Sequence, residues 1–175
     1  MKKHHTIIGI IFVSVLGTLA HFLYELSSFS TLVGLFTPIN ESIWEHLKLL
    51  FFPVLLFSVI EYFVRDKKEC FVCSRTIALF IGMLFIVIAF YTISGVIGKA
   101  YDWVNIAIYY VSVLIVFLGS ELLIKNCKGI STSGVVFCLS LLILTAALFF
   151  IFTFYTPSLN IFIDPVTKFR GIYRK

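Results

Sequence analysis

The chain has 175 residues, of which 60% are hydrophobic, 17% aromatic and only 13% charged, with a formal net charge of +5 and a mean hydropathy of +1.05. Soluble domains are about 45–50% apolar and about 25% charged, so this composition excludes an ordinary water-soluble enzyme, a disordered chain and a disulfide scaffold. The sequence predicts an all-α integral membrane protein, with residues 1–175 forming a single transmembrane domain.

Five apolar runs are each long enough to cross a hydrocarbon core of about 30 Å as a helix. They cover residues 7–24, 46–64, 76–98, 104–124 and 132–155, and leave a tail at 156–175. The first run resembles a signal peptide, but His21, Phe22 and Tyr24 stand where a polar mature sequence would begin, so we expect it to remain as a span. Small residues spaced four apart predict close helix contacts at Ser14 with Thr18 and at Ser94 with Gly98.

The distribution of Lys and Arg predicts a cytoplasmic N-terminus in the cell membrane. In that orientation only Lys48 and Lys99 lie outside before the tail. Eight basic residues lie inside: Lys2, Lys3, Arg65, Lys67, Lys68, Arg75, Lys125 and Lys128. The tail breaks the rule, because five spans place Lys168, Arg170, Arg174 and Lys175 outside, so four or six spans remain alternatives. The net positive charge follows from the membrane-side bias, and we expect no nucleic-acid partner.

Two acids near the inner ends of spans precede a base by one helical turn. Glu61 stands four residues before Arg65, and Glu121 four before Lys125, so both are expected to form structural ion pairs. Metal-binding side chains also gather on this side, and a metal site there is an alternative, although an isolated CxxC spacing is a weak signal. They are His4, His5, Cys70, Cys73 and Cys127. Cys138 is expected to be a small packing residue inside a span.

The densest polar stretch, FTPINESIWEHLKLL at 36–50, precedes and opens the second span. Ser42 is placed to cap the helix, with Glu45 closing a capping box, and Trp44 suits the aromatic belt of a membrane surface. Capping does not explain Glu41 or His46. Glu41 and Glu45 would stack like charges on one helix face, which Lys48, three residues after Glu45, neutralises only in part.

The first span brings His21 and Glu25 to the same outer surface, four residues apart and on one helix face. If residues 25–41 fold the second span against the first, these two side chains meet Glu41, Glu45 and His46. Mixed histidine and carboxylate ligands suit zinc or a similar divalent ion, with His21, Glu45 and His46 as candidates, although no HExxH spacing is present. For acid–base catalysis the candidates are Glu41, Glu45 and His46.

The tail combines the apolar run 161–163 with basic residues. It is expected to fold back as a lid or interfacial segment in which Lys168 and Arg170 meet Glu41 and Glu45, with a solvated tail as the alternative. The complete predicted binding set is His21, Glu25, Asn40, Glu41, Trp44, Glu45, His46, Lys48, Asp164, Lys168 and Arg170.

The segment GLFTPINESIWEHLKLLFFPVLL at 34–56 resembles the signature of an uncharacterised family of small bacterial multi-span membrane proteins, a domain of unknown function. The shared core is NES-x-WEH-x-KL, at residues 40–49 here, and HFLYE around His21 and FIDP around Asp164 are also similar to the family pattern. The resemblance implies the fold and the membrane location, and it implies no activity.

Three functions are compatible with these patterns. The first is an outer acidic and histidine pocket that binds or transports a small solute or a lipid headgroup. The second is a membrane-embedded, metal-dependent hydrolase or transferase that acts on lipid. The third is an accessory subunit that packs against a membrane partner or a second copy of the chain, with the polar cluster as a structural network.

Overall fold

The computed structural model describes residues 2–66, 68–98 and 101–172, with side chains from residue 4 onward. It is all-helical, as predicted, and five of its helices are long and apolar enough to cross a membrane. The elements are α1 (Lys2–Leu26), α2 (Thr31–Phe36), α3 (Ile43–Tyr62), α4 (Lys68–Ile97), α5 (Asp102–Asn126), α6 (Thr132–Phe154) and a 3₁₀ turn, η1 (Asn160–Phe162). This confirms the predicted fold class and its five spans. The short helix α2 between the first two spans was not predicted.

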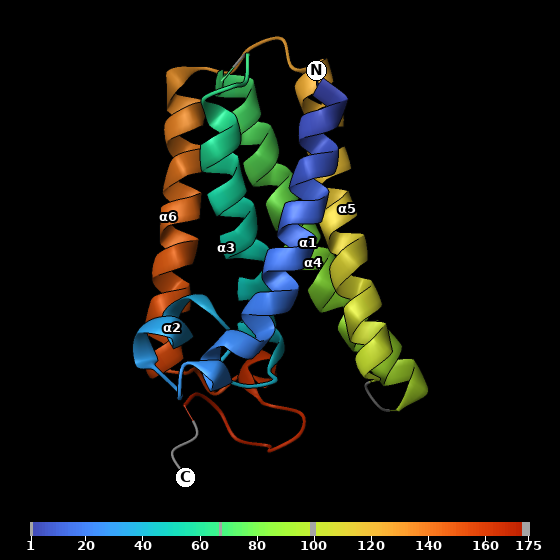
Figure 1. Cartoon of the computed structure of the whole chain (residues 1–175), viewed down its shortest axis with the longest axis vertical. Coiled ribbons are helices and arrows are strands. Elements are labelled where there is room, and N and C mark those ends of the chain that lie inside the picture. Colours follow the sequence, from blue (N-terminus) through green and yellow to red (C-terminus); the bar gives the residue numbers. More distant parts are fainter. Residues whose placement is uncertain (1, 67, 99–100, 173–175) are drawn as a thin grey trace.

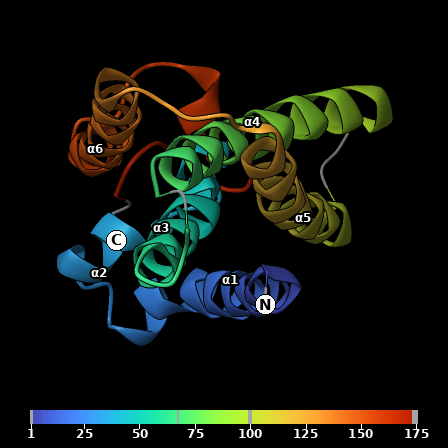
Figure 2. The same cartoon turned by 90° about the horizontal axis from the view of Figure 1, so that it is seen from above.

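The five long helices run alongside one another, and α3 lies in the middle of the bundle (Figures 1 and 2). It packs against α1, α4, α5 and α6. In its most apolar window 56% of the residues are buried, compared with 17–33% in the other four spans. The central helix of the bundle is therefore also the one that carries the polar sequence at 40–48.

The core consists of large side chains from several helices, with Phe51, Val13, Phe117 and Phe149 completely buried. The opposite faces of the same helices carry apolar side chains that are largely exposed, such as Ile11 and Leu144. Because exposed apolar surface of this extent is unfavourable in water, it is the surface that lipid chains would cover.

The two ends of the bundle differ in their chemistry. The odd number of long helices places the chain termini at opposite ends (Figure 1). We call the end with the N-terminus and the connections at 63–66 and 127–131 the cysteine end. The other, with the end of α1, helix α2, residues 37–42 and the tail 155–172, is the histidine end. Lys67, Lys99, Arg174 and Lys175, which contributed to the predicted charge bias, lie outside the described residues.

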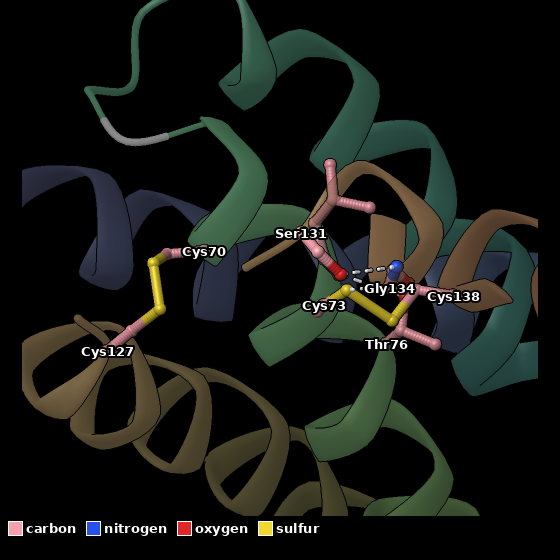
Figure 3. The surroundings of a disulfide bond; sticks show 8 residues. Cys70, Cys73, Thr76, Cys127, Ser131, Gly134 and Cys138 are labelled. Carbon is pink, nitrogen blue, oxygen red and sulfur yellow. Dashed lines mark hydrogen bonds between the residues drawn. A yellow bond between two sulfur atoms is a disulfide. The ribbon is translucent and has the colours of Figure 1, made fainter. Parts of the chain in front are cut away.

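The cysteine end holds two disulfides rather than a metal site. Cys70 is bonded to Cys127 after α5, and Cys73 is bonded to Cys138 of α6, so α4 is tied to a different neighbour through each (Figure 3). The expectation that Cys138 is only a packing residue is therefore wrong. Within the described chain no metal-ligand group includes His4, His5 or a cysteine. The reason is that all four cysteines are bonded to one another in pairs, which leaves no thiol to bind a metal ion.

Charged side chains at the cysteine end form one buried network. Arg65 binds Glu61, as the sequence predicts, but it also binds Glu121 of α5, which takes this partner in place of the expected Lys125. Arg75 of α4 donates to the second oxygen of Glu61 at 2.7 Å. The network therefore joins α3, α4, α5 and the α3–α4 connection across the bundle.

Candidate functional site

Two histidines and a carboxylate converge at the histidine end. His21 lies near the end of α1, His46 lies in the first turn of α3, and Glu41 lies in the turn just before α3. The two Nε2 atoms are 3.2 Å apart, and Glu41 Oε2 lies 3.4 Å from His46 Nε2 and 3.8 Å from His21 Nε2. The expected meeting of the first span with the start of the second is therefore present in these three residues.

The separations within this triad fit a metal centre. Ligand atoms that bind a tetrahedral zinc ion at 2.0–2.1 Å lie about 3.3–3.4 Å from one another. The second ring nitrogen of His46, Nδ1, donates to the backbone carbonyl of Ser42 at 3.0 Å. Such a hydrogen bond fixes the ring orientation and leaves Nε2 of the neutral ring with its lone pair free for a metal ion.

The residues of the triad can bind protons as well as a metal ion. The pKa of Glu41 lies below its ordinary value, chiefly because His46 donates a hydrogen bond to it, and the charges of both histidines act in the same direction against the effect of burial. A metal ion at Nε2 of His46 would take the place of a hydrogen bond to Glu41, so metal ions and protons compete for the triad.

The triad lies between two cavities of about 420 Å³ each, and Glu41 lines both. We call them the α5 cavity and the α1 cavity. Polar residues on the wall of the α5 cavity are His46, Asp102, Asn105, Tyr109 and Lys168. Those on the wall of the α1 cavity are His21, Tyr24, Glu25, Asn40, Asp164 and Thr167. Each cavity is large enough for a small polar molecule in contact with the triad.

Asn105 and Tyr109 of α5 were not among the predicted site residues. With Asp102 they are spaced three and four apart, which places all three on one face of α5. Polar side chains at this spacing inside an apolar span were the sequence signal that could have found them. Tyr109 is anchored there, since its hydroxyl donates to the carbonyl of Val13 at 2.8 Å.

Glu45 and Lys48 form a separate buried ion pair below the triad, 2.6 Å apart. The Lys48 ammonium also donates to the carbonyl of Gly34 at 2.9 Å and to Thr153 Oγ1 at 2.8 Å, so all three of its donors are used. Glu45 Oε2 accepts from the backbone N–H of Ile39. The third member of the metal-ligand group is Glu41, whereas Glu45 was the candidate ligand predicted from the sequence. The Glu45–Lys48 pair instead holds α2, α3 and α6 together.

The start of α3 is capped largely as the sequence predicts. Ser42 Oγ accepts from the backbone N–H of Glu45. The reciprocal partner is Asn40 rather than the Glu45 side chain, since the Ser42 N–H donates to Asn40 Oδ1 at 2.9 Å. Asn40 also donates to the carbonyl of Gly171 at 2.9 Å. One asparagine therefore fixes both the turn that carries Glu41 and the end of the tail.

The tail folds back across the histidine end, anchored by aromatic contacts. Trp44, expected in the aromatic belt, packs against Phe149, Phe152 and Phe162, with ring centroids 4.9–5.5 Å apart. The Asp164 carboxylate accepts the backbone N–H groups of Val166 and Thr167. Asp164 thus shapes the turn that forms part of both cavity walls.

The basic residues of the tail do not reach the acids as expected. Lys168 lines the α5 cavity and Arg170 lies apart from both cavities, and within the described residues neither forms an ion pair with Glu41 or Glu45. The acids have nearer partners, since Glu45 binds Lys48 and Glu41 binds the histidines.

Comparison with known proteins gives a family and no activity. Residues 1–172 match the profile described as a family of unknown function, DUF6512, which is nearly the whole chain. No curated protein and no solved structure shows a match. The expected relation to a family of unknown function is thereby confirmed, while the proposed core motif and bacterial source stay predictions. The chain belongs to the family of unknown function DUF6512.

Proposed function

We propose that the histidine end binds a divalent metal ion, zinc in the simplest case, through His21, Glu41 and His46, and that a small solute or lipid headgroup binds beside it. The observation that carries the proposal is the set of separations of 3.2, 3.4 and 3.8 Å among the three ligand atoms. Transport of that solute through the cell membrane would be an extension of the same function.

Two further features support a binding site rather than a purely structural network. The triad is bordered on both sides by a cavity, whereas the Glu45–Lys48 pair beneath it is closed off and has its hydrogen bonds satisfied within the protein. The cavity walls also combine acidic, amide and ammonium groups, which is the polar minority that orients a solute in an otherwise apolar pocket.

Metal analysis of the purified protein tests the proposal. After equilibration with Zn²⁺ and gel filtration in detergent, we expect about one zinc per chain, as a three-ligand site with one open position predicts. His21→Ala and His46→Ala should lose the ion. His4→Ala is the matched control, because it removes an exposed histidine from the same helix as His21, at the opposite end of the bundle.

Zinc retained equally by all four proteins, or by none, would refute the metal site. The pH dependence adds a second criterion, because protonation of the histidines competes with the ion. Affinity should fall as the pH is lowered through the range in which histidines take up protons. A pH-independent affinity between pH 5 and 8 would also contradict the proposed ligands.

The second candidate function is a metal-dependent hydrolase or transferase. It is favoured by the number of ligands, because catalytic zinc sites have three protein ligands and keep one position open for water or substrate. As an enzyme, the protein would receive the reacting group in the α5 cavity, next to Asp102 and Asn105. Hydrolysis of lipid esters or phosphodiesters by zinc-loaded protein, lost in His46→Ala and kept in His4→Ala, would support this function over simple binding.

We further propose that the N-terminus is cytoplasmic and that the histidine end faces outward. The support is the distribution of Lys and Arg in the sequence, where the five-span topology predicts eight on the side of the N-terminus and two on the other side before the tail. The two disulfides lie at the cysteine end, and disulfides are rare in the cytoplasm. The proposed orientation therefore requires that these pairs be held as thiols in the cell.

A further inference from the structure

A third cavity, of about 250 Å³, lies between α3, α4 and α6 at the cysteine end. Most of its wall is hydrocarbon or aromatic, including Leu55, Val72, Leu139 and Leu142. The polar residues on it are Ser58, Tyr62, Arg75 and Thr76. It shares no lining residue with the cavities at the histidine end, so a ligand bound here would be independent of the metal site proposed above.

Arg75 on this wall is buried without its full set of hydrogen bonds. Its side chain is 4% exposed, and one terminal nitrogen donates to Glu61 at 2.7 Å. Its Nε and its other terminal nitrogen, Nη1, have no partner within the described chain, and the same holds for Ser58 Oγ on the same cavity wall. Arginine is always charged, and buried donors of this kind are almost always paired, so the cavity lacks an acceptor.

The depth of Arg75 matches the level of lipid headgroups. Helix α4 has 30 residues and is therefore about 45 Å long, close to the whole thickness of a bilayer with its headgroups. Arg75 stands seven residues after its first residue, Lys68, or about 10 Å along the axis. That position lies near the boundary between the headgroups and the hydrocarbon core, where a lipid phosphate resides.

The unpartnered donors on the cavity wall favour an anion. Arg65 and Arg75 balance the charges of Glu61 and Glu121, and Arg75 keeps two donors for another acceptor. At the rim, the ammonium of Lys68 lies 4.8 Å from the ring centre of Tyr62, which lines the cavity. An anionic group in the cavity would thus meet the guanidinium of Arg75 on the wall and have the ammonium of Lys68 nearby, beside Tyr62.

We propose that this cavity binds one anionic phospholipid. A phosphate oxygen accepts hydrogen bonds from Arg75 and Ser58, and an acyl chain lies along the apolar wall formed by α3, α4 and α6. Cys73 of α4 and Cys138 of α6 meet close to this wall, to which Thr76 belongs (Figure 3). The cavity therefore lies at a corner of the bundle where α4 and α6 are in close contact.

Native mass spectrometry of the delipidated full chain, with defined lipids added back, tests this assignment. We expect one phosphatidylglycerol per chain, retained about ten-fold or more over phosphatidylcholine, because charge-assisted hydrogen bonds to Arg75 would be strengthened by the net charge of the lipid. Leu139→Trp, which fills the cavity from α6, should abolish retention. Leu144→Trp is the matched control, since Leu144 is on the same helix, exposed and not on the cavity wall.

Arg75→Gln should weaken phosphatidylglycerol binding by about ten-fold or more. This variant also removes a bond to Glu61, so the two tryptophan variants decide the outcome if it fails to fold. Equal retention of both phospholipids, or undiminished retention in Leu139→Trp, would overturn the proposal. Preferential retention of oleate over phosphatidylglycerol would also overturn it, because the site would then recognise a fatty-acid carboxylate.

Discussion

At the scale of single residues, the ion pair of Glu45 with Lys48 dominates the histidine end. Both side chains are almost completely buried, and each is held by further hydrogen bonds. A buried charge that loses its partner is costly, by about 3–5 kcal/mol, because neither water nor another group neutralises it. The pair therefore makes the local fold sensitive to either residue.

Lys48→Met should lower the free energy of unfolding by about 3–5 kcal/mol, because it leaves the Glu45 carboxylate buried without its cation. Thermal unfolding in detergent measures the change. The double variant Glu45→Gln with Lys48→Met should be more stable than Lys48→Met alone, since it removes the uncompensated charge. A single variant as stable as the wild type would mean that the pair is dispensable.

Glu41 should make stability depend on pH in the acid range. Its folded pKa lies below the ordinary value of 4.5 because His46 donates a hydrogen bond to it, so its contribution is present above pH 4.5 and is lost as the pH falls through the folded pKa. In metal-free buffer, Glu41→Gln should melt at a lower temperature than the wild type at pH 5, and the difference in melting temperature should shrink as the pH is lowered below 4.5. Glu25→Gln, which removes an exposed carboxylate of α1, serves as the control.

The sequence predicted which residue types gather at the histidine end, but not how they divide. Glu41 and Glu45 stand four residues apart and were equally good partners for the histidines by spacing alone. Their roles separate because Thr153 on α6 and the carbonyl of Gly34 on α2 complete a pocket for Lys48 directly beside Glu45. These contacts join residues 14 and 105 positions apart, and spacing along one helix does not reveal them.

At the scale of helices, α1 is positioned by a glycine. A Cβ atom on Gly17 would lie 2.0 Å from Tyr109 Oη and 2.7 Å from the carbonyl oxygen of Leu49. Helix α1 therefore approaches α3 and α5 closely at this point, which is one turn before His21. The neighbouring Thr18 reaches the same side, with its Oγ1 3.1 Å from Tyr110 Oη.

Gly17→Ala should destabilise the protein by about 1–3 kcal/mol, because the added methyl group must displace α1 or break the hydrogen bond from Tyr109 to Val13. Since α1 carries His21, the same variant should weaken zinc binding. Gly95→Ala is the matched control, because a Cβ there meets no atom within 4 Å and alanine favours a helix. Equal melting temperatures for the two variants would contradict the close contact.

The five spans were predictable because each is an uninterrupted apolar run, and a helix is the only way for such a run to satisfy its backbone in lipid. The contacts between spans were less accessible. Close contact was expected at both Ser14 with Thr18 and Ser94 with Gly98, yet a Cβ on Gly98 would meet no atom within 4 Å. Small residues allow two helices to approach each other closely but do not by themselves bring them together. Whether such a pair lies at a helix contact therefore depends on whether another helix is next to it.

At the scale of the whole molecule, the two ends carry chemistries that conflict over orientation. The excess of basic residues favours the cytoplasm for the cysteine end, while the two disulfides there are typical of an oxidising compartment. The basic side chains were counted in the sequence, whereas the pairing of Cys73 with Cys138 depends on α4 and α6 being neighbours. The sequence therefore revealed the basic residues that favour a cytoplasmic cysteine end, but not the disulfides that are typical of an oxidising compartment.

The native cysteines can decide the orientation, because all four belong to the two disulfides of the cysteine end. If that end is cytoplasmic, the cell keeps the pairs reduced, and cells quenched in acid and alkylated with N-ethylmaleimide under denaturing conditions should yield protein carrying four adducts. If it faces an oxidising compartment, the protein should carry none until a reductant is added.

Thr167→Cys in a chain whose native cysteines are replaced by serine gives the control at the other end, since Thr167 is exposed in the tail. It should react with a membrane-impermeant maleimide in intact cells if the histidine end faces outward. Absence of adducts on the native cysteines together with an unreactive Thr167→Cys would reverse the proposed orientation and place the histidine triad on the cytoplasmic side.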